Sequence, residues 1–123
     1  MPRVFRHDAI TLHNEVKEED FTKFMQEKLV PHFSKRYKGP TRTSRADLKG
    51  QSLFKDAKGR RKYLWITIWE GSPESVQGLA FEHTRMVRFE DTDAVLKKLE
   101  SFGKRTTEKI FTELVSIEVP TNA

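Results

Sequence analysis

The chain has 123 residues, enough for one domain with its own hydrophobic core but short for two. Hydrophobic residues make up 36% of it and charged residues 33%, which is polar for a compact domain. We therefore expect an oligomer interface to complete part of the hydrophobic core. The absence of cysteine excludes a disulfide scaffold and thiolate chemistry, and no apolar run of about 18 residues indicates a membrane-spanning helix. We expect a single cytoplasmic domain over residues 1–123 that does not contact a membrane.

Positive charge is concentrated in one part of the chain. Residues 35–62 contain eleven lysines and arginines and two acids, whereas residues 63–123 contain seven bases and ten acids. Such a basic segment can bind an anionic partner, or it can be a solvated hairpin whose charges keep sheet edges from pairing. No nucleic-acid-binding motif accompanies the charge, so the sequence favours the hairpin over a nucleic-acid partner.

The first half of the chain indicates a strand and a long helix. Apolar and polar residues alternate over residues 4–16, which predicts the first strand. A helix is expected from Lys17, because the acids that follow suit the positive N-terminal dipole. Pro31 should kink or interrupt this helix, and Gly39-Pro40 should end it. Its inward stripe is Phe21, Phe24, Met25, Leu29, His32 and Phe33.

The strongest strand signal of the chain covers residues 63–70. A weaker, basic strand pattern with a bulge expected at Gly50 precedes it over residues 41–54, and Asp56-Ala-Lys-Gly59 predicts the connecting turn, with positive φ at Gly59. Both faces of residues 63–70 are apolar, which indicates a central strand covered on both sides. Alternation places Tyr63, Trp65, Thr67 and Trp69 on one face and Leu64, Ile66 and Ile68 on the other.

Two helices and a strand are expected in the remaining chain. Ser72 and Pro73 suit the start of a helix that runs to about Val87. Residues 90–93 indicate a break, within which Thr92 can cap a further helix ending at Gly103. Alternation over residues 111–119 predicts the last strand. The order β-α-β-β-α-(α)-β is that of a ferredoxin-like α+β fold, an antiparallel four-stranded sheet with helices on one face.

The run Tyr63-Leu-Trp-Ile-Thr-Ile-Trp-Glu-Gly-Ser-Pro-Glu74 adds a family resemblance. Placed after a basic hairpin and before a short helix with His83, it resembles the third strand and second helix of antibiotic-biosynthesis-monooxygenase-like proteins. The likeness extends in outline over His13 to Phe33. It implies a dimeric α+β barrel, in which the sheets of two copies pair and each subunit has a small-molecule cavity between its sheet and its helices. Members include cofactor-independent oxygenases of aromatic polyketides and haem-degrading enzymes.

Histidines are the main candidates for catalysis, because their unperturbed pKa lies near neutrality. His83 is a polar side chain on an otherwise apolar helical stripe, so it is either a hydrogen-bonded core residue or part of a cavity. The resemblance to haem-degrading members matches Asn14 and His83 to their strand asparagine and helix histidine, although both tryptophans of this chain lie on a strand. A metal site of His13, His32 and His83 would join distant residues, and we predict no metal.

These observations lead to the hypothesis of a homodimeric enzyme that oxygenates an aromatic or polycyclic substrate without a bound cofactor. His83 or His13 would deprotonate a phenol or polarise a carbonyl, and Asn14 would orient oxygen or the substrate. The substrate-binding residues would be Trp65, Trp69, Tyr63, His32 and Arg85. Two alternatives stay open: a non-catalytic ligand-binding or stress-response domain of the same fold, and a haem-degrading enzyme.

Overall fold

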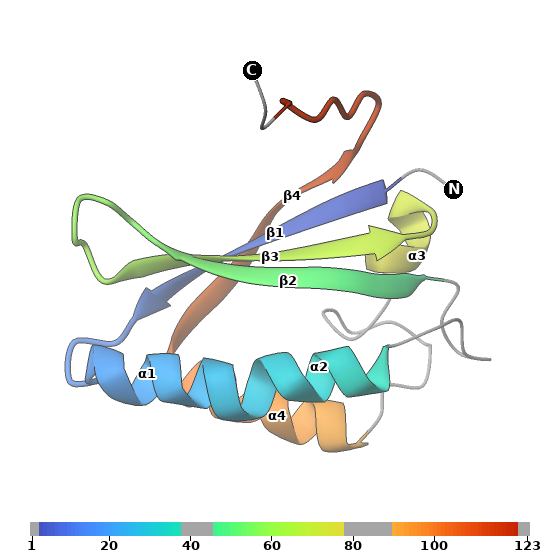
Figure 1. Cartoon of the computed structure of the whole chain (residues 1–123). Coiled ribbons are helices and arrows are strands. Elements are labelled where there is room, and N and C mark those ends of the chain that lie inside the picture. Colours follow the sequence, from blue (N-terminus) through green and yellow to red (C-terminus); the bar gives the residue numbers. More distant parts are fainter. Residues whose placement is uncertain (1–2, 38–45, 78–89, 121–123) are drawn as a thin grey trace.

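The computed structural model of the chain describes residues 3–37, 46–77 and 90–120. These residues form one four-stranded antiparallel sheet with the strand order β2-β3-β1-β4. The strands are β1 (Arg3–Leu12), β2 (Asp47–Lys55), β3 (Lys62–Glu70) and β4 (Gly103–Thr112). The helices α1 (Glu18–Phe24), α2 (Val30–Arg36) and α4 (Glu90–Phe102) lie against one face of the sheet, here called the inner face, and the short helix α3 (Pro73–Gln77) follows β3 (Figure 1). The predicted ferredoxin-like α+β fold is confirmed.

The interior strand β3 is built as its alternation predicts. Trp65 and Trp69 are fully buried on the inner face, and each makes an edge contact with an aromatic ring of the helix layer. Phe33 lies 5.0 Å from Trp65, and Tyr37 lies 5.7 Å from Trp69, measured between ring centroids. The opposite, outer face carries the aliphatic side chains of β3, which are only half-buried. The expected cover on both sides is therefore present on the inner face alone.

Pro31 interrupts the first helix without ending it. A π-helical segment, Met25–Leu29, joins α1 directly to α2, in which Pro31 occupies the first turn. Proline lacks the N–H that would bond the preceding turn, and its ring crowds a carbonyl of that turn, so the helix widens where the ladder is broken. The apolar stripe still faces the sheet, since Phe21, Leu29 and Phe33 are fully buried.

Two predicted boundaries in the first strand and last helix are wrong. β1 ends at Leu12 rather than residue 16, because its pairing with β4 ends there and the chain turns, with the Val16 N–H donating to the His13 carbonyl. Helix α4 begins at Glu90, so residues 90–93 are helical and Thr92 is not an N-cap. Its buried side chain instead contacts the ring of His32.

The last strand lies earlier in the sequence than predicted. β4 starts at Gly103, directly after α4, and ends at Thr112, so the strand predicted over residues 111–119 is wrong. Residues 113–120 have no regular structure and expose Leu114 and Ile117. Gly103 permits the abrupt change from helix to strand, because a Cβ atom there would lie 2.4 Å from the carbonyl oxygen of Thr11.

The hairpin between β2 and β3 confirms the local predictions made for it. The register shifts between Leu48 and Gly50, at the predicted bulge, and Gly59 has a φ of 66°. The Lys58 N–H donates to the Asp56 carboxylate, which closes the turn. Residues 41–45 of the predicted strand, and the predicted helix beyond α3, lie outside the described residues. No helix in the described ranges is long and apolar enough to cross a membrane.

Candidate functional site

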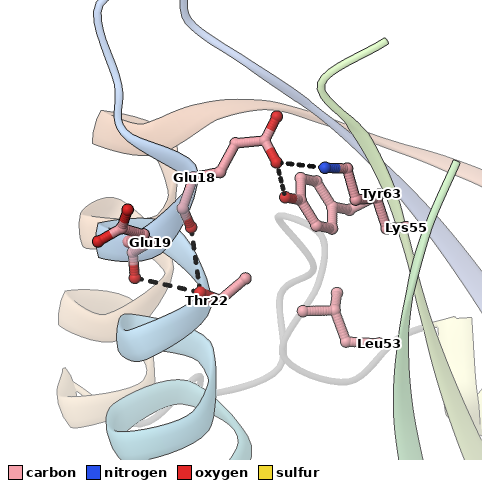
Figure 2. Close-up of a pocket in the computed structure, with 6 residues that line it drawn as sticks. All are labelled: Glu18, Glu19, Thr22, Leu53, Lys55 and Tyr63. Atoms are coloured by element: carbon pink, nitrogen blue, oxygen red, sulfur yellow. Dashed lines mark hydrogen bonds and ion pairs between the residues drawn. The ribbon is translucent and has the colours of Figure 1, made fainter. Parts of the chain in front are cut away.

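An open pocket with a volume of about 400 Å³ lies between α1 and the inner face of the sheet, where β2 and β3 approach their hairpin. Figure 2 shows the carboxylate of Glu18 reaching from the start of α1 toward the two strands. The side chain of Glu19, next along the helix, points away from them. The pocket is lined by Glu18, Glu19, Thr22, Leu53, Lys55 and Tyr63.

Local structure brings the three polar groups of this pocket together. Lys55 and Tyr63 are direct cross-strand partners of the β2–β3 hairpin, so their side chains project to the same face. Glu18 is the first residue of α1, where a carboxylate is favoured by the positive end of the helix dipole. The turn after β1 places that helix end on the side of the sheet that the helices cover, below the hairpin strands in Figure 1.

Both hydrogen bonds to Glu18 end on one carboxylate oxygen. The Lys55 ammonium donates to Oε2 at 2.6 Å, and the Tyr63 hydroxyl donates to the same atom at 2.8 Å. These bonds, from Lys55 first and then from Tyr63, hold the pKa of Glu18 below its ordinary value, so the carboxyl is ionised at neutral pH. Burial, together with the bond to Glu18, raises the pKa of Tyr63 to about 12, so its hydroxyl stays protonated and acts as a donor.

The predicted catalytic residues in the described chain lie outside this pocket. His13 is exposed on the turn after β1, and its Nε2 is 3.1 Å from the Glu100 carbonyl oxygen near the end of α4. Asn14 is exposed on the same turn. His83, the third candidate, lies outside the described residues.

The predicted substrate-binding residues are separated by the fold. Tyr63 lines the pocket, whereas Trp65 and Trp69 are fully buried and pack the core. Their ring N–H groups donate to Gln51 Oε1 at 3.1 Å and to Thr67 Oγ1 at 2.8 Å. The tryptophans therefore form no wall of this pocket.

His32 and Arg85, the other two predicted substrate-binding residues, do not line the described pocket either. The Nε2 of His32 is 2.7 Å from Thr92 Oγ1, and this contact ties α2 to α4. Burial lowers the pKa of His32, so the imidazole is neutral at neutral pH. Arg85 lies outside the described residues.

Sequence reasoning missed Glu18 and Lys55. The signal for Lys55 was partial, because the predicted turn over residues 56–59 places Lys55 at the hairpin end but would pair it with Arg60, whereas it pairs with Tyr63 in the structure. The contact of Glu18 with Lys55 joins residues 37 positions apart, and only the packing of α1 on the sheet creates it.

The described residues offer no cluster that could hold a metal ion, and the lining of the pocket does not fit haem. No group of three or more His, Asp or Glu side chains in the described ranges could hold a metal ion. Haem iron takes a histidine, cysteine, methionine or tyrosine ligand. The described lining supplies only Tyr63 of these types, and its hydroxyl donates to Glu18. This lining does not fit haem.

A second polar group on the inner face is a buried ionic network. Arg6 and Asp8, both fully buried, are joined by an Nε to Oδ2 hydrogen bond of 3.0 Å. Arg105 Nη1 and Thr107 Oγ1 of β4 donate to Asp8 Oδ1 at 3.1 and 2.9 Å. Arg6 Nη2 donates to the Thr107 hydroxyl at 2.6 Å. Charged groups this deep must be paired, so the network fixes β1 against β4.

No protein-family model matches the chain, and no curated protein matches it by sequence. Among solved structures, it is similar to a variant of SnoaB, a cofactor-independent oxygenase from Streptomyces nogalater, with a TM-score of 0.64, 13% identity, and coverage of 94% of this chain and 96% of that one. The chain is also similar to a protein from Bordetella bronchiseptica assigned as an antibiotic biosynthesis monooxygenase, with a TM-score of 0.58, 14% identity, and coverage of 95% of this chain and 100% of that one. For the protein YJCS the TM-score is 0.54 and the identity 12%, with coverage of 93% of this chain and 99% of that one. The chain thus has the fold of antibiotic-biosynthesis-monooxygenase-like structures.

Proposed function

We propose that the protein is a small-molecule enzyme that oxygenates an aromatic substrate in the pocket between α1 and the inner face, without a resident cofactor. The pocket itself carries this proposal, because its volume of about 400 Å³ lies in the range of roughly 300–1,000 Å³ typical of small-molecule sites. Its lining combines an apolar side chain, Leu53, with an ionised pair, Glu18 and Lys55. The similarity in fold to a cofactor-independent oxygenase supports this choice of reaction.

Oxygenation without a cofactor requires the substrate itself to supply electrons to oxygen, which an organic anion does more readily than its neutral acid. The site therefore needs a base and a group that stabilises negative charge. Glu18 and Lys55 are of these two types and are in contact. His83, on the helix predicted to follow Pro73, stays a candidate for a further base, and Arg85 for a further cation.

Filling the pocket should weaken ligand binding while leaving the fold intact. Leu53 is a half-buried lining residue, so Leu53→Trp places an indole where the substrate ring would lie. An indole in that space should cost ligand binding about 1–3 kcal/mol, which predicts about a 5- to 150-fold loss of affinity for naphthols and a parallel loss of oxygen uptake. Calorimetric titration and an oxygen electrode measure the two effects.

Gln26→Trp is the matched control, since Gln26 is exposed in the helix layer and is not one of the residues that line the pocket. It should bind naphthols as the unmodified chain does. Unchanged binding by Leu53→Trp would contradict the site. Binding by the unmodified chain with no oxygen uptake for any hydroxylated aromatic compound would leave the non-catalytic ligand-binding alternative.

We also propose that a second copy of the chain covers the outer face. No helix of the described chain lies on that side (Figure 1). Phe54 and Phe111, on the two edge strands β2 and β4, are 52% and 45% exposed there, and the half-buried aliphatic row of β3 lies on the same face. A hollow of about 320 Å³ beside Ala9 and Leu64 leaves room for a partner's side chains. An apolar face of this kind marks an interaction surface, and two-fold pairing is the commonest way to cover one.

Sedimentation at micromolar concentration should therefore give about twice the chain mass of 14.4 kDa. Ile66→Lys, which places a charge near the middle of the outer face, should give the single-chain mass. Gln26→Lys, an exposed position in the helix layer, should not change it. A single-chain mass for the unmodified protein would contradict the dimer.

A further inference from the structure

We infer that the outer face of the sheet pairs with a second copy while His7 is uncharged, and that protonation of His7 separates the two copies in mild acid. This inference rests on the proposed dimer and names the group that regulates it. It does not depend on the pocket between α1 and the inner face, or on the reaction proposed there.

His7 lies in the interior of the outer face. It belongs to β1, one of the two interior strands of the sheet, and its side chain is half-buried. Its cross-strand partners are Ile66 of β3 and Lys109 of β4, and directly opposite side chains share a face. The ring centroid of His7 lies 4.9 Å from that of Phe111. A second copy that covers Ile66 and Phe111 therefore covers the imidazole as well.

A positive charge on His7 has no counter-ion in this part of the sheet. Within the part of the chain that the structure describes, the ring nitrogens of His7 make no hydrogen bond or ion pair. Of the described side chains around it on the outer face, Lys109 alone is charged, and its charge is positive. The others are Phe5, Ala9, Ser52, Leu64, Ile66, Ile68, Thr106 and Phe111.

The described acids of the outer face lie at one end of it. Glu70 is the cross-strand partner of Arg3, which bonds to Glu113 at 2.8 Å. The charged side chains that the strands place on this face are Arg3, Lys62, Glu70, Lys104 and Lys109, as far as the structure describes them. Two-fold pairing brings the same face of both copies together, so the middle of the partner's face adds a second His7 and a second Lys109 rather than an acid.

Covering His7 therefore makes the pairing sensitive to pH. In the separate chain the half-buried ring can take up a proton, and a histidine ordinarily has a pKa of about 6.5. In the dimer an imidazolium would lose contact with solvent among apolar side chains and Lys109, which costs free energy because no opposite charge compensates it. The separate chain thus binds a proton that the dimer excludes, so the dimer is stable above about pH 6.5 and weakens as the pH falls below it.

Sedimentation equilibrium of the unmodified chain tests this inference at about pH 7.5 and about pH 5.5, on either side of the ordinary pKa of histidine. The dissociation constant of the dimer should rise about 100-fold at the lower pH, about tenfold for each of the two His7 side chains. A rise of less than about tenfold would overturn the inference and leave the dimer in place. A single-chain mass at the higher pH would instead contradict the proposed dimer itself.

Variants of two histidines identify the group that titrates. His7→Leu, which carries no charge, should form the dimer equally well at both pH values, and His7→Lys should give the single-chain mass at both. His13→Gln is the matched control and should keep the pH dependence, because His13 is exposed on the turn after β1 and its ring lies against the end of α4. A pH dependence that survives in His7→Leu, or a dimer formed by His7→Lys, would overturn the role of His7.

Circular dichroism separates dissociation from unfolding. The far-ultraviolet spectrum of the unmodified chain should be the same at both pH values, because His7 lies on the outer face and not in the core. A spectrum that changes at the lower pH would assign the separation to unfolding and overturn the inference.

Discussion

Asp8→Asn is expected to lower the free energy of unfolding by about 3–5 kcal/mol, a large part of the stability of a domain of this size. Asp8 is fully buried, and its carboxylate accepts hydrogen bonds from Arg6, Arg105 and Thr107. The neutral amide removes the charge between two guanidinium groups and turns one acceptor into a donor that faces them. Urea unfolding measures the loss.

Glu15→Gln provides the comparison for this variant, because it makes the same chemical change at an exposed position of the turn after β1. It should alter the free energy of unfolding by no more than about 0.5 kcal/mol. A loss of less than about 1 kcal/mol for Asp8→Asn would mean that the network adds little to the fold, against what its burial predicts.

Gly103→Ala is expected to cost about 3 kcal/mol, at the upper end of the range for overpacking. The added methyl group would lie 2.4 Å from the carbonyl oxygen of Thr11, and relief would require β4 to move away from β1. Because backbone rather than a flexible side chain forms the contact, the clash cannot be removed by a rotamer change.

Gly50→Ala is the matched control, since its Cβ atom would meet the nearest side-chain atom of Ile68 at an ordinary 3.5 Å. It should change the free energy of unfolding by less than about 1 kcal/mol. Thermal or urea unfolding of both variants gives the comparison. Equal losses at the two glycines would show that the close contact between Gly103 and the Thr11 carbonyl does not require glycine at position 103.

Local patterns in the sequence predicted the elements whose determinants lie close together along the chain. The alternation around Trp65, the turn at Gly59, the bulge before Gly50 and the apolar stripe of the first helix are all of this kind, and all appear in the structure. Each depends on periodicity or on the conformational range of one residue type.

The position of β4 could not be predicted in the same way. Its inward positions include Arg105 and Thr107, which donate hydrogen bonds to the buried carboxylate of Asp8 on β1 instead of packing in an apolar core. A strand whose inward side chains are charged lacks the apolar alternation by which a strand is recognised in a sequence. The apolar alternation lies instead in the exposed residues after β4, and for this reason the strand was predicted over residues 111–119.

The candidate site was only partly predictable for a related reason. Tyr63 was found, because the aromatic strand carries its own signal. Glu18 and Lys55 look like ordinary surface charges in sequence, and most such charges are. Their contact with Tyr63 depends on where α1 crosses the hairpin, which is a tertiary property.

The position of a bound ligand tests the central claim most directly, and a crystal structure of the protein with para-nitrophenol would determine it. We expect the ring of the ligand to lie against Leu53 in the pocket under α1, with its phenolic oxygen within hydrogen-bonding distance of Glu18 and Lys55. A ligand bound instead in the outer-face hollow beside Ala9 and Leu64, with the pocket between α1 and the inner face left empty, would contradict the proposed site.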